Sequence, residues 1–260
     1  MNCSLCQSTR CSLFFTLGSR GKYKFYRCNE CGLVIYDRTG GLDQKKYAVR
    51  IRDPEDPAHA SNKIQSQSYD FIQRHIHSRG RFLDIGCGNG HLLSRARDDG
   101  WTVEGLELSS ELAEYVKNRL DIDVITADFM HFVPRDRNQY DCIVLRHVLE
   151  HLPDPVAAMN SIHSLLAPGG MALLEFPNIM GLDCRVKRVV RKTGLYTKKY
   201  REDYRPGHCH EFCRKSFSRL IDMTGFKLQV WETYSIRPLA NLLYRTIHIG
   251  NKARALIQKT

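Results

Sequence analysis

Short apolar runs alternate with helix-spaced apolar positions from about residue 61 to residue 234. A continuous run of about four to eight apolar residues predicts a buried strand, and apolar residues three and four apart predict a covering helix. Because alternating strands and helices are typical of a parallel sheet, the pattern predicts an α/β fold with three layers and a mostly parallel sheet. The expected strands are Arg81–Ile85, Trp101–Leu108, Ile122–Thr126, Tyr140–Leu145, Met171–Phe176 and Phe226–Tyr234.

The expected helices lie between these strands and beyond the last one. They begin at Ser61 and continue with Leu92–Asp98, Ser110–Arg119, Pro155–Leu166, Arg214–Thr224 and Pro238–His248. Ser109 precedes one of them as an N-cap residue. Pro168–Gly170 is expected to be the turn before the fifth strand.

The first 37 residues follow a different pattern, with two Cys-x-x-Cys pairs separated by short apolar segments. Two such pairs can close a tetrahedral shell of four thiolates around one zinc ion. The sequence therefore predicts a structural zinc ribbon at 1–37, a polar connector at 38–60 and an α/β domain at 61–260 with a basic insertion at about 179–207. Four free thiols are the alternative. The expected ligands are Cys3, Cys6, Cys28 and Cys31.

A glycine-rich turn joins the first strand of the α/β region to its helix. Gly86, Gly88 and Gly90 follow Asp84 at every second position, and Glu107 ends the next strand about 20 residues later. Such a turn lets a ligand approach the backbone, and a carboxylate at that position binds ribose hydroxyls. Both NAD(P) and S-adenosylmethionine present such a ribose. The spacing is G-x-G-x-G rather than the G-x-G-x-x-G of dinucleotide sites.

The stretch from Asp84 to Gly90 resembles the first motif of the class I S-adenosylmethionine-dependent methyltransferases, D-x-G-x-G-x-G. The resemblance implies that S-adenosylmethionine is the cofactor and that Lys252–Lys259 is a seventh, antiparallel strand. It also implies that Asp128 accepts from the adenine amino group and that Phe129 packs on the ring, with a helix cap as the alternative role of Asp128. The full set of implied cofactor residues is Asp84, Gly86, Cys87, Gly88, Gly90, Glu107, Leu108, Asp128, Phe129 and Arg146.

The segment after the fourth strand, from Arg146 to Pro155, is expected to line the reaction site because ligands sit beyond strand ends in open parallel sheets. It contains the H-x-x-E-H pattern of zinc proteases, His147 to His151. We reject that interpretation, because the pattern needs a sustained helix and Pro153 and Pro155 follow almost at once. The segment is instead similar to the L-E-H-L-x-x-P stretch of small-molecule methyltransferases, and it lacks the N-P-P-Y or D-P-P-Y of the branch that methylates adenine or glutamine amino groups.

Three histidines are candidates for a general base, because an imidazole titrates near neutral pH. His147 is the first choice, and His208 and His210 follow from a resemblance to an H-x-H-x-F stretch that faces the acceptor pocket. A packed histidine without catalytic function is the alternative for that stretch. A second metal site at His208, His210 and Cys213 is a weaker hypothesis.

Charge is distributed unevenly along the chain, which has a net charge of +11. Residues 1–52 hold 10 Lys and Arg against 3 Asp and Glu, residues 53–175 hold 11 against 19, and residues 176–260 hold 18 against 6. The two basic ends would attract phosphate groups of a nucleotide sugar, a lipid surface or RNA. In the insertion, Leu182, Val186 and Val189 alternate with cations, which is typical of a basic amphipathic helix that rests on an anionic membrane, binds an acceptor or is simply solvated.

The sequence lacks a signal-peptide pattern, and its ten cysteines indicate reduced thiols, so we expect a cytoplasmic protein, with a peripheral position at the inner face of the membrane as the alternative. The expected function is methyl transfer to an oxygen or carbon of a small molecule or glycan: a sugar, a nucleotide sugar or a lipid-linked saccharide. This follows from the resemblance of the cysteine pairs and the adjoining C-G-L-V-I-Y-D to ribbons of glycan methyltransferases. RNA methylation is one alternative, and a non-catalytic zinc-ribbon binding protein is another.

Overall fold

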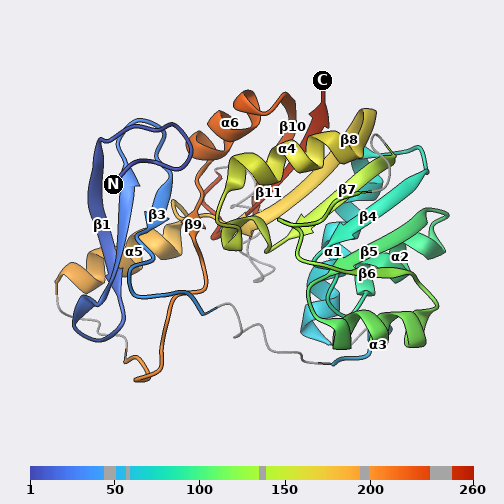
Figure 1. Cartoon of the computed structure of the whole chain (residues 1–260), viewed down its shortest axis with the longest axis horizontal. Coiled ribbons are helices and arrows are strands. Elements are labelled where there is room, and N and C mark those ends of the chain that lie inside the picture. The colour runs from blue at the N-terminus through green and yellow to red at the C-terminus, as the bar shows by residue number, and fades with distance from the viewer. Residues whose placement is uncertain (44–50, 57–58, 135–138, 194–198, 235–247) are drawn as a thin grey trace.

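The computed structural model describes residues 1–43, 51–56, 59–134, 139–193, 199–234 and 248–260 (Figure 1). The helix expected at Pro238–His248 lies outside the described residues except for its last position. Within the described part, none of the helices is both long and apolar enough to cross a bilayer.

A seven-stranded sheet forms the centre of the larger part of the molecule, in the order β10-β11-β8-β7-β4-β5-β6. β4 pairs in parallel with β5 and β7, and β11 runs antiparallel to both of its neighbours, β10 and β8. The predicted α/β fold with a mostly parallel sheet is confirmed. The strands are β4 (Arg81–Ile85), β5 (Thr102–Glu107), β6 (Val124–Thr126), β7 (Tyr140–Arg146), β8 (Leu166–Pro177), β10 (Phe226–Tyr234) and β11 (Lys252–Lys259).

Helices cover both faces of this sheet because each presents one apolar face to it. Tyr69 and Phe71 belong to the same buried cluster as Leu92 and Val116, whereas Met159 packs in a second cluster on the other face. Ser109 caps its helix as expected, since its hydroxyl accepts from the Leu112 N–H. The helices are α1 (Ala60–His75), α2 (His91–Asp98), α3 (Ser110–Leu120), α4 (Pro155–Leu165), α5 (Leu182–Lys192) and α6 (Arg214–Met223), with short 3-10 turns η1 (Ser19–Gly21) and η3 (Leu149–His151).

The expected turn at Pro168–Gly170 lies inside a strand, so the prediction of where that strand begins is wrong. Leu166 of β8 pairs with Tyr140 of β7, and Met171 pairs with Cys142. Four residues of β8 therefore lie opposite one residue of β7, Asp141. The extra residues loop out as a large bulge, which Gly169 permits through its φ of +74°. The strand therefore starts directly after α4.

The N-terminal residues form a second, four-stranded sheet in the order β1-β2-β3-β9. Its strands are β1 (Cys11–Leu17), β2 (Tyr23–Cys28), β3 (Val34–Tyr36) and β9 (His210–Glu211), and Figure 1 shows them as a separate layer beside the larger sheet. β9 comes from far along the chain and pairs with Val34 and Ile35. Leu5 and Leu33 share a buried cluster with Phe217 of α6. The ribbon is thus completed by, and packed on, the α/β part.

Candidate active site

The glycine turn and the acid of the next strand lie side by side. Ile85 of β4 pairs with Leu106 of β5 in the parallel sheet. The next residue of each strand, Gly86 and Glu107, therefore lies beside the other at the carboxyl edge of the sheet. The Gly88 N–H donates to Glu107 Oε2 at 2.9 Å, and the Ser109 N–H donates to Oε1 at 3.1 Å. Two backbone donors therefore orient this carboxylate, which keeps further lone pairs for hydroxyl donors.

The three glycines of the turn serve two purposes. A Cβ on Gly86 would lie 2.6 Å from Val148, and one on Gly90 would lie 2.9 Å from Val116, so these positions need glycine for close packing. A Cβ on Gly88 would meet none of the described residues within 4 Å, although its φ of +58° also favours glycine. Open space therefore borders the backbone of Gly88 on the side of Glu107, and the contact of this turn with a ribose stays a prediction.

The side chains of Asp84 and Cys87 are buried beneath the glycine turn, on the side of the core. Asp84 is buried, and burial raises the pKa of its carboxyl to about 7 despite the opposing effect of the Arg146 guanidinium. Cys87 is buried against Gly105, and burial raises the pKa of its thiol, so it packs as a small apolar residue. Only the backbone of Cys87 belongs to the open side of the turn.

The Arg146 side chain is engaged in a buried charge cluster. Its Nε donates to Glu175 Oε2 at 2.8 Å and to the Ser68 hydroxyl at 3.0 Å, and Arg254 Nε lies 3.1 Å from Glu175 Oε1. Burial alone would raise the pKa of Glu175, but the two guanidinium groups and Ser68 lower it to about 2. Arg146 therefore braces the ends of β7 and β8, and its contact with a cofactor stays a prediction.

The predicted adenine and ribose neighbours lie farther along the same edge. Asp128 is exposed, accepts from the Met130 N–H at 2.9 Å and lies 2.9 Å from His131 Nδ1, so its carboxylate closes a local turn and does not cap any of the described helices. Phe129 is buried in the core cluster, whereas Leu108 is 69% exposed beside Glu107. Their contacts with the donor stay predictions.

His147 stands directly after β7 in a left-handed conformation, with a φ of 58°. Its N–H donates to the Glu175 carbonyl at 2.8 Å, which holds this strained residue in place. His147 Nδ1 lies 3.1 Å from Glu150 Oε1, and Lys252 Nζ lies 3.2 Å from His147 Nε2. Because an ionised carboxylate only accepts, Nδ1 carries the proton and Nε2 is the basic nitrogen. Lys252 is a functional candidate that sequence reasoning missed.

His208 and His210 occupy different surroundings. His210 is buried, with Nδ1 3.1 Å from the Leu152 carbonyl and Nε2 2.9 Å from the Ser4 hydroxyl of the ribbon. Burial lowers its pKa to about 4, so it is a packed neutral histidine, the alternative stated for that stretch. His208 is half-buried: burial lowers its pKa, but the Glu211 carboxylate 2.9 Å away produces a net rise.

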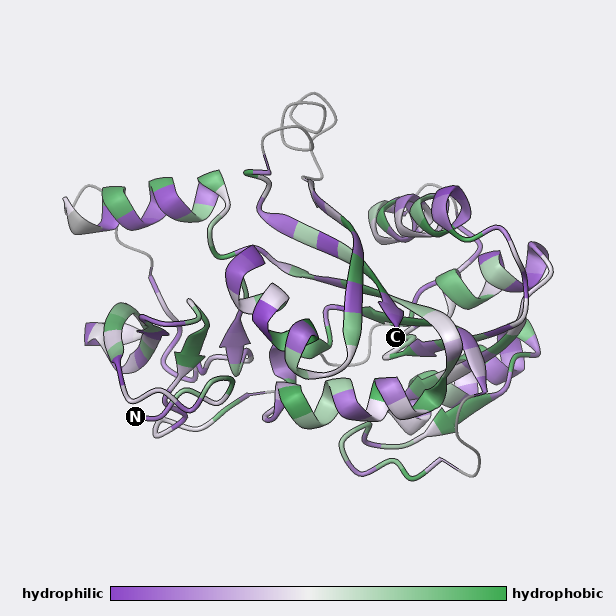
Figure 2. Ribbon diagram, turned by 90° about the horizontal axis from the view of Figure 1, so that it is seen from above, coloured by the Kyte–Doolittle hydropathy of each residue, from purple (hydrophilic) through white to green (hydrophobic). Residues whose placement is uncertain are grey.

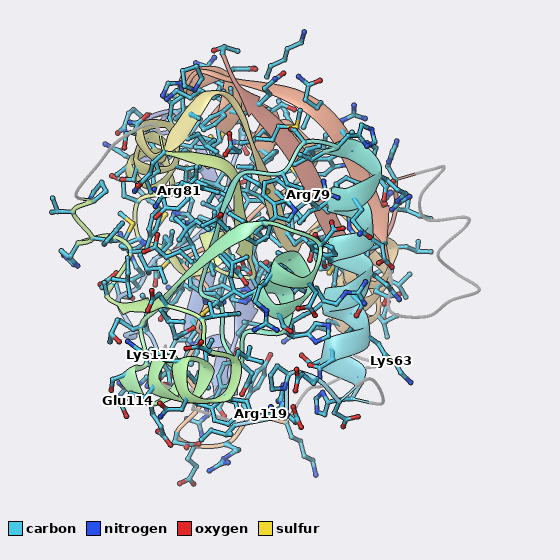
Figure 3. All side chains as sticks on the ribbon, turned by 90° about the vertical axis from the view of Figure 1, so that its right-hand side faces the viewer. Lys63, Arg79, Arg81, Glu114, Lys117 and Arg119 are labelled. Atoms are coloured by element: carbon cyan, nitrogen blue, oxygen red, sulfur yellow. The ribbon has the colours of Figure 1, made fainter. Side chains whose placement is uncertain are left out.

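The connector contributes a segment that covers the glycine turn, and sequence reasoning did not find it. The Arg52 N–H donates to Asn89 Oδ1 at 2.8 Å, and His91 Nδ1 donates to the Pro54 carbonyl. Asn62 Nδ2 donates to the carbonyls of residues 53, 54 and 56, with the shortest distance 2.8 Å. Arg119 of α3 forms ion pairs with Asp53 and Glu55. Figure 3 labels Arg119 near the same end of the molecule as Lys63 of α1. We call residues 51–56 the cover segment.

The four N-terminal cysteines converge. All four Sγ atoms lie within 4.8 Å of one another, and the Cys3–Cys31 and Cys6–Cys28 pairs are each 3.5 Å apart. A disulfide would need about 2.05 Å. Thiolates around one tetrahedral zinc ion stand about 3.8 Å apart, given a bond length of about 2.3 Å. The cluster thus fits the predicted ligand set.

Comparisons with known proteins agree with this geometry. A family model described as a methyltransferase domain matches residues 58–230. A ubiquinone biosynthesis O-methyltransferase of Xylella fastidiosa is 26% identical over 189 residues, which cover 68% of this chain and 76% of the relative.

Solved structures show the same fold at low identity. The magnesium protoporphyrin IX methyltransferase of Synechocystis, with bound SAH, has a TM-score of 0.58 and 15% identity over 77% of this chain and 84% of its own. The cyclase SpnF has a TM-score of 0.57 and 18% identity over 79% and 84%. Since a cyclase shares the fold, the architecture alone does not fix the reaction.

Proposed function

Because the chain belongs to the methyltransferase family whose model matches its residues 58–230, we propose that it transfers a methyl group from S-adenosylmethionine to an oxygen of a small-molecule acceptor. His147 lies between Glu150 and Lys252, and this arrangement is the observation that favours an oxygen acceptor. A hydroxyl group must lose a proton when it is methylated, and His147 is placed to accept that proton. The O-methyltransferase name of the Xylella relative supports the same choice.

Each part of the site has a separate task in this proposal. S-adenosylmethionine, when bound, supplies an activated methyl group on a sulfonium. The backbone at Gly88 and the carboxylate of Glu107 hold its ribose, and the cover segment shields the turn from water. Holding the donor and acceptor in line provides most of the rate enhancement.

His147 is the general base in this proposal. Glu150, which is buried, fixes the tautomer and stabilises the imidazolium that forms when Nε2 takes the acceptor proton. The acceptor hydroxyl replaces Lys252 at Nε2, and the adjacent Lys252 amine then faces the developing oxyanion. His208 is kept as a second candidate, and His210 is left out because both of its ring nitrogens are engaged.

We further propose that the acceptor carries phosphate, as a nucleotide sugar or a lipid-linked saccharide does. A groove of about 1020 Å³ separates β1 from α5, and cations line it beside the rings of Phe14 and Phe15. These cations are Arg20, Lys187, Arg188, Arg191 and Lys199. Figure 2 shows apolar and polar bands along α5, and its apolar Leu182, Val186 and Val189 are exposed, which supports contact with a membrane surface.

The four-cysteine cluster is proposed to hold structural zinc. Two Cys-x-x-Cys turns supply all four ligands, and a closed thiolate shell leaves no position for chemistry. The division into a ribbon at 1–37, a connector at 38–60 and a methyltransferase domain at 61–260 is part of the same proposal, with β9 as the element that links the first to the last.

A labelled-methyl assay with S-adenosylmethionine tests this function. We expect transfer to a phosphate-bearing saccharide, and expect H147Q to lower kcat by about 100-fold, the lower end of the usual contribution of a general base. H77Q replaces an exposed histidine two residues beyond the end of α1 and should leave kcat unchanged. Label found in RNA, with binding that weakens steeply as salt rises, would overturn the acceptor class.

A further inference from the structure

A second cluster of potential metal ligands lies between η3 and the segment before β9. One carboxylate oxygen of Glu150 and one ring nitrogen each of His151 and His208 lie within 4.8 Å of one another. The two imidazole rings are 4.7 Å apart between centroids. This set differs from the His208, His210 and Cys213 site considered from the sequence, and it omits His147 of the H-x-x-E-H pattern.

The hydrogen bonds of both histidines fix the tautomer that a metal ligand needs. His151 Nδ1 lies 2.9 Å from the Gly207 carbonyl, and His208 Nδ1 lies 2.9 Å from Glu211 Oε1. Carbonyl and carboxylate oxygens only accept, so each Nδ1 donates and each Nε2 carries the lone pair. Metal-binding histidines almost always donate their other nitrogen to a carbonyl or carboxylate in this way.

The Glu150 carboxylate supplies an independent observation. Its side chain is 1% exposed, His147 contacts Oε1, and Oε2 is buried and has no hydrogen-bond partner among the residues that the structure describes. An unpaired buried carboxylate oxygen is costly, and a bound cation is one of the few groups that offset such a cost. Oε2 is therefore the carboxylate oxygen that a cation would satisfy.

We propose that Glu150 Oε2, His151 Nε2 and His208 Nε2 bind one divalent transition-metal ion of the zinc class. Two imidazoles and one carboxylate are a typical three-residue set for zinc, and they leave one coordination position for water or an acceptor oxygen. The ion would stand beside His147, which shares Glu150, and next to the glycine turn that Val148 contacts. Only the placement of that open position near an acceptor depends on the proposed function.

Cobalt titration of the full-length protein, with its cysteine cluster loaded with zinc, tests the site. We expect one further equivalent of Co²⁺ to bind, with the visible bands of nitrogen and oxygen ligands and no thiolate charge-transfer band. H208Q should weaken binding by about 100-fold or more, and E211Q, which alters only the partner of His208, by about 10- to 100-fold. H77Q is the matched control and should not change the affinity.

X-ray absorption at the cobalt edge of the unmutated protein provides a readout that needs no variant, with imidazole scattering expected. The proposal is overturned if no further equivalent binds at millimolar Co²⁺ or Zn²⁺, or if the further equivalent binds H208Q unchanged. Both of these outcomes are measured by metal binding and do not depend on methyl-transfer activity. A protein that binds the ion but transfers no methyl group would instead count against the proposed function.

Discussion

At the scale of single residues, Glu107 carries the strongest prediction for donor binding. Its carboxylate is oriented by two backbone N–H groups and would accept hydrogen bonds from ribose hydroxyls. Hydrogen bonds to a charged group contribute about 1.5–3 kcal/mol each, so E107A should weaken S-adenosylmethionine binding by about 100-fold or more in calorimetry. E104Q, on the same strand but bonded to Tyr140, is the control and should bind normally. Unchanged affinity in E107A would refute the ribose assignment.

Asp84 predicts a pH dependence of donor binding. Burial raises the pKa of its carboxyl to about 7, so the group is mostly neutral below that pH and ionised above it. S-adenosylmethionine carries positive charge and favours the ionised form, so binding should tighten as the pH rises through 7. If only the ionised form binds, affinity at pH 6 should be about tenfold below its high-pH limit.

Calorimetry at pH 6, 7 and 8 in two buffers of different ionisation enthalpy checks this prediction, because proton release accompanies binding near pH 6. D84N has no proton to lose, so its affinity should be weaker and independent of pH over this range. A slope that persists in D84N would show that another group titrates.

Sequence reasoning reached these two residues because a motif of fixed spacing carries them. The glycine turn, Asp84 and Glu107 lie within two consecutive strand ends, where the local pattern determines the geometry. Lys252 could not be found in this way, because it meets His147 only after β11 has inserted beside β8. Arg146 was correctly placed at the strand end, but its partners Ser68 and Glu175 come from other elements.

At the scale of elements, the cover segment makes the clearest prediction. Asn62 is buried and its amide donates to three carbonyls of residues 53–56, whereas the Arg119 pairs are exposed and screened by solvent. Buried hydrogen bonds contribute about 1 kcal/mol each, and exposed ion pairs contribute far less. N62A should therefore loosen residues 51–56 and weaken donor binding by about tenfold, while R119A should change it little.

Hydrogen exchange of residues 51–56 and donor titration of both variants check this ranking. If R119A loosens the segment as much as N62A does, the assignment of Asn62 as its anchor is wrong. The segment was assigned from sequence only as a polar connector, because a stretch held by backbone carbonyls shows no periodicity. β9 was missed for a similar reason, since a strand of two residues has no pattern to detect.

At the scale of the whole molecule, the two sheets form one structure through the C-terminal half of the chain. The sequence predicts a division between the cysteine-rich residues and the α/β domain, because their patterns differ in period and composition. It could not show that β3 pairs with β9 or that Leu5 and Leu33 pack in one cluster with Phe217. Contacts between residues about 200 positions apart depend on the folded domain rather than on any local pattern.

This coupling yields a prediction for the zinc ligands. The ribbon has a small core of its own, so metal binding should supply most of its folding free energy, as in small zinc modules. C28S should lose one equivalent of zinc by elemental analysis and should lose amide protection in residues 1–36. Because β9 pairs with β3, protection should also fall at 208–213, while β4 and β5 remain protected.

Cys184 on α5 provides the control, since it lies outside the four-cysteine cluster. C184S should keep the zinc and the exchange pattern of the unmutated protein. The C28S substitution removes metal from the four-cysteine cluster alone, whereas a chelator would also remove metal from the proposed site at Glu150. Normal protection of residues 1–36 in zinc-free C28S would mean that packing against α6, and not the metal, holds the ribbon in its folded state.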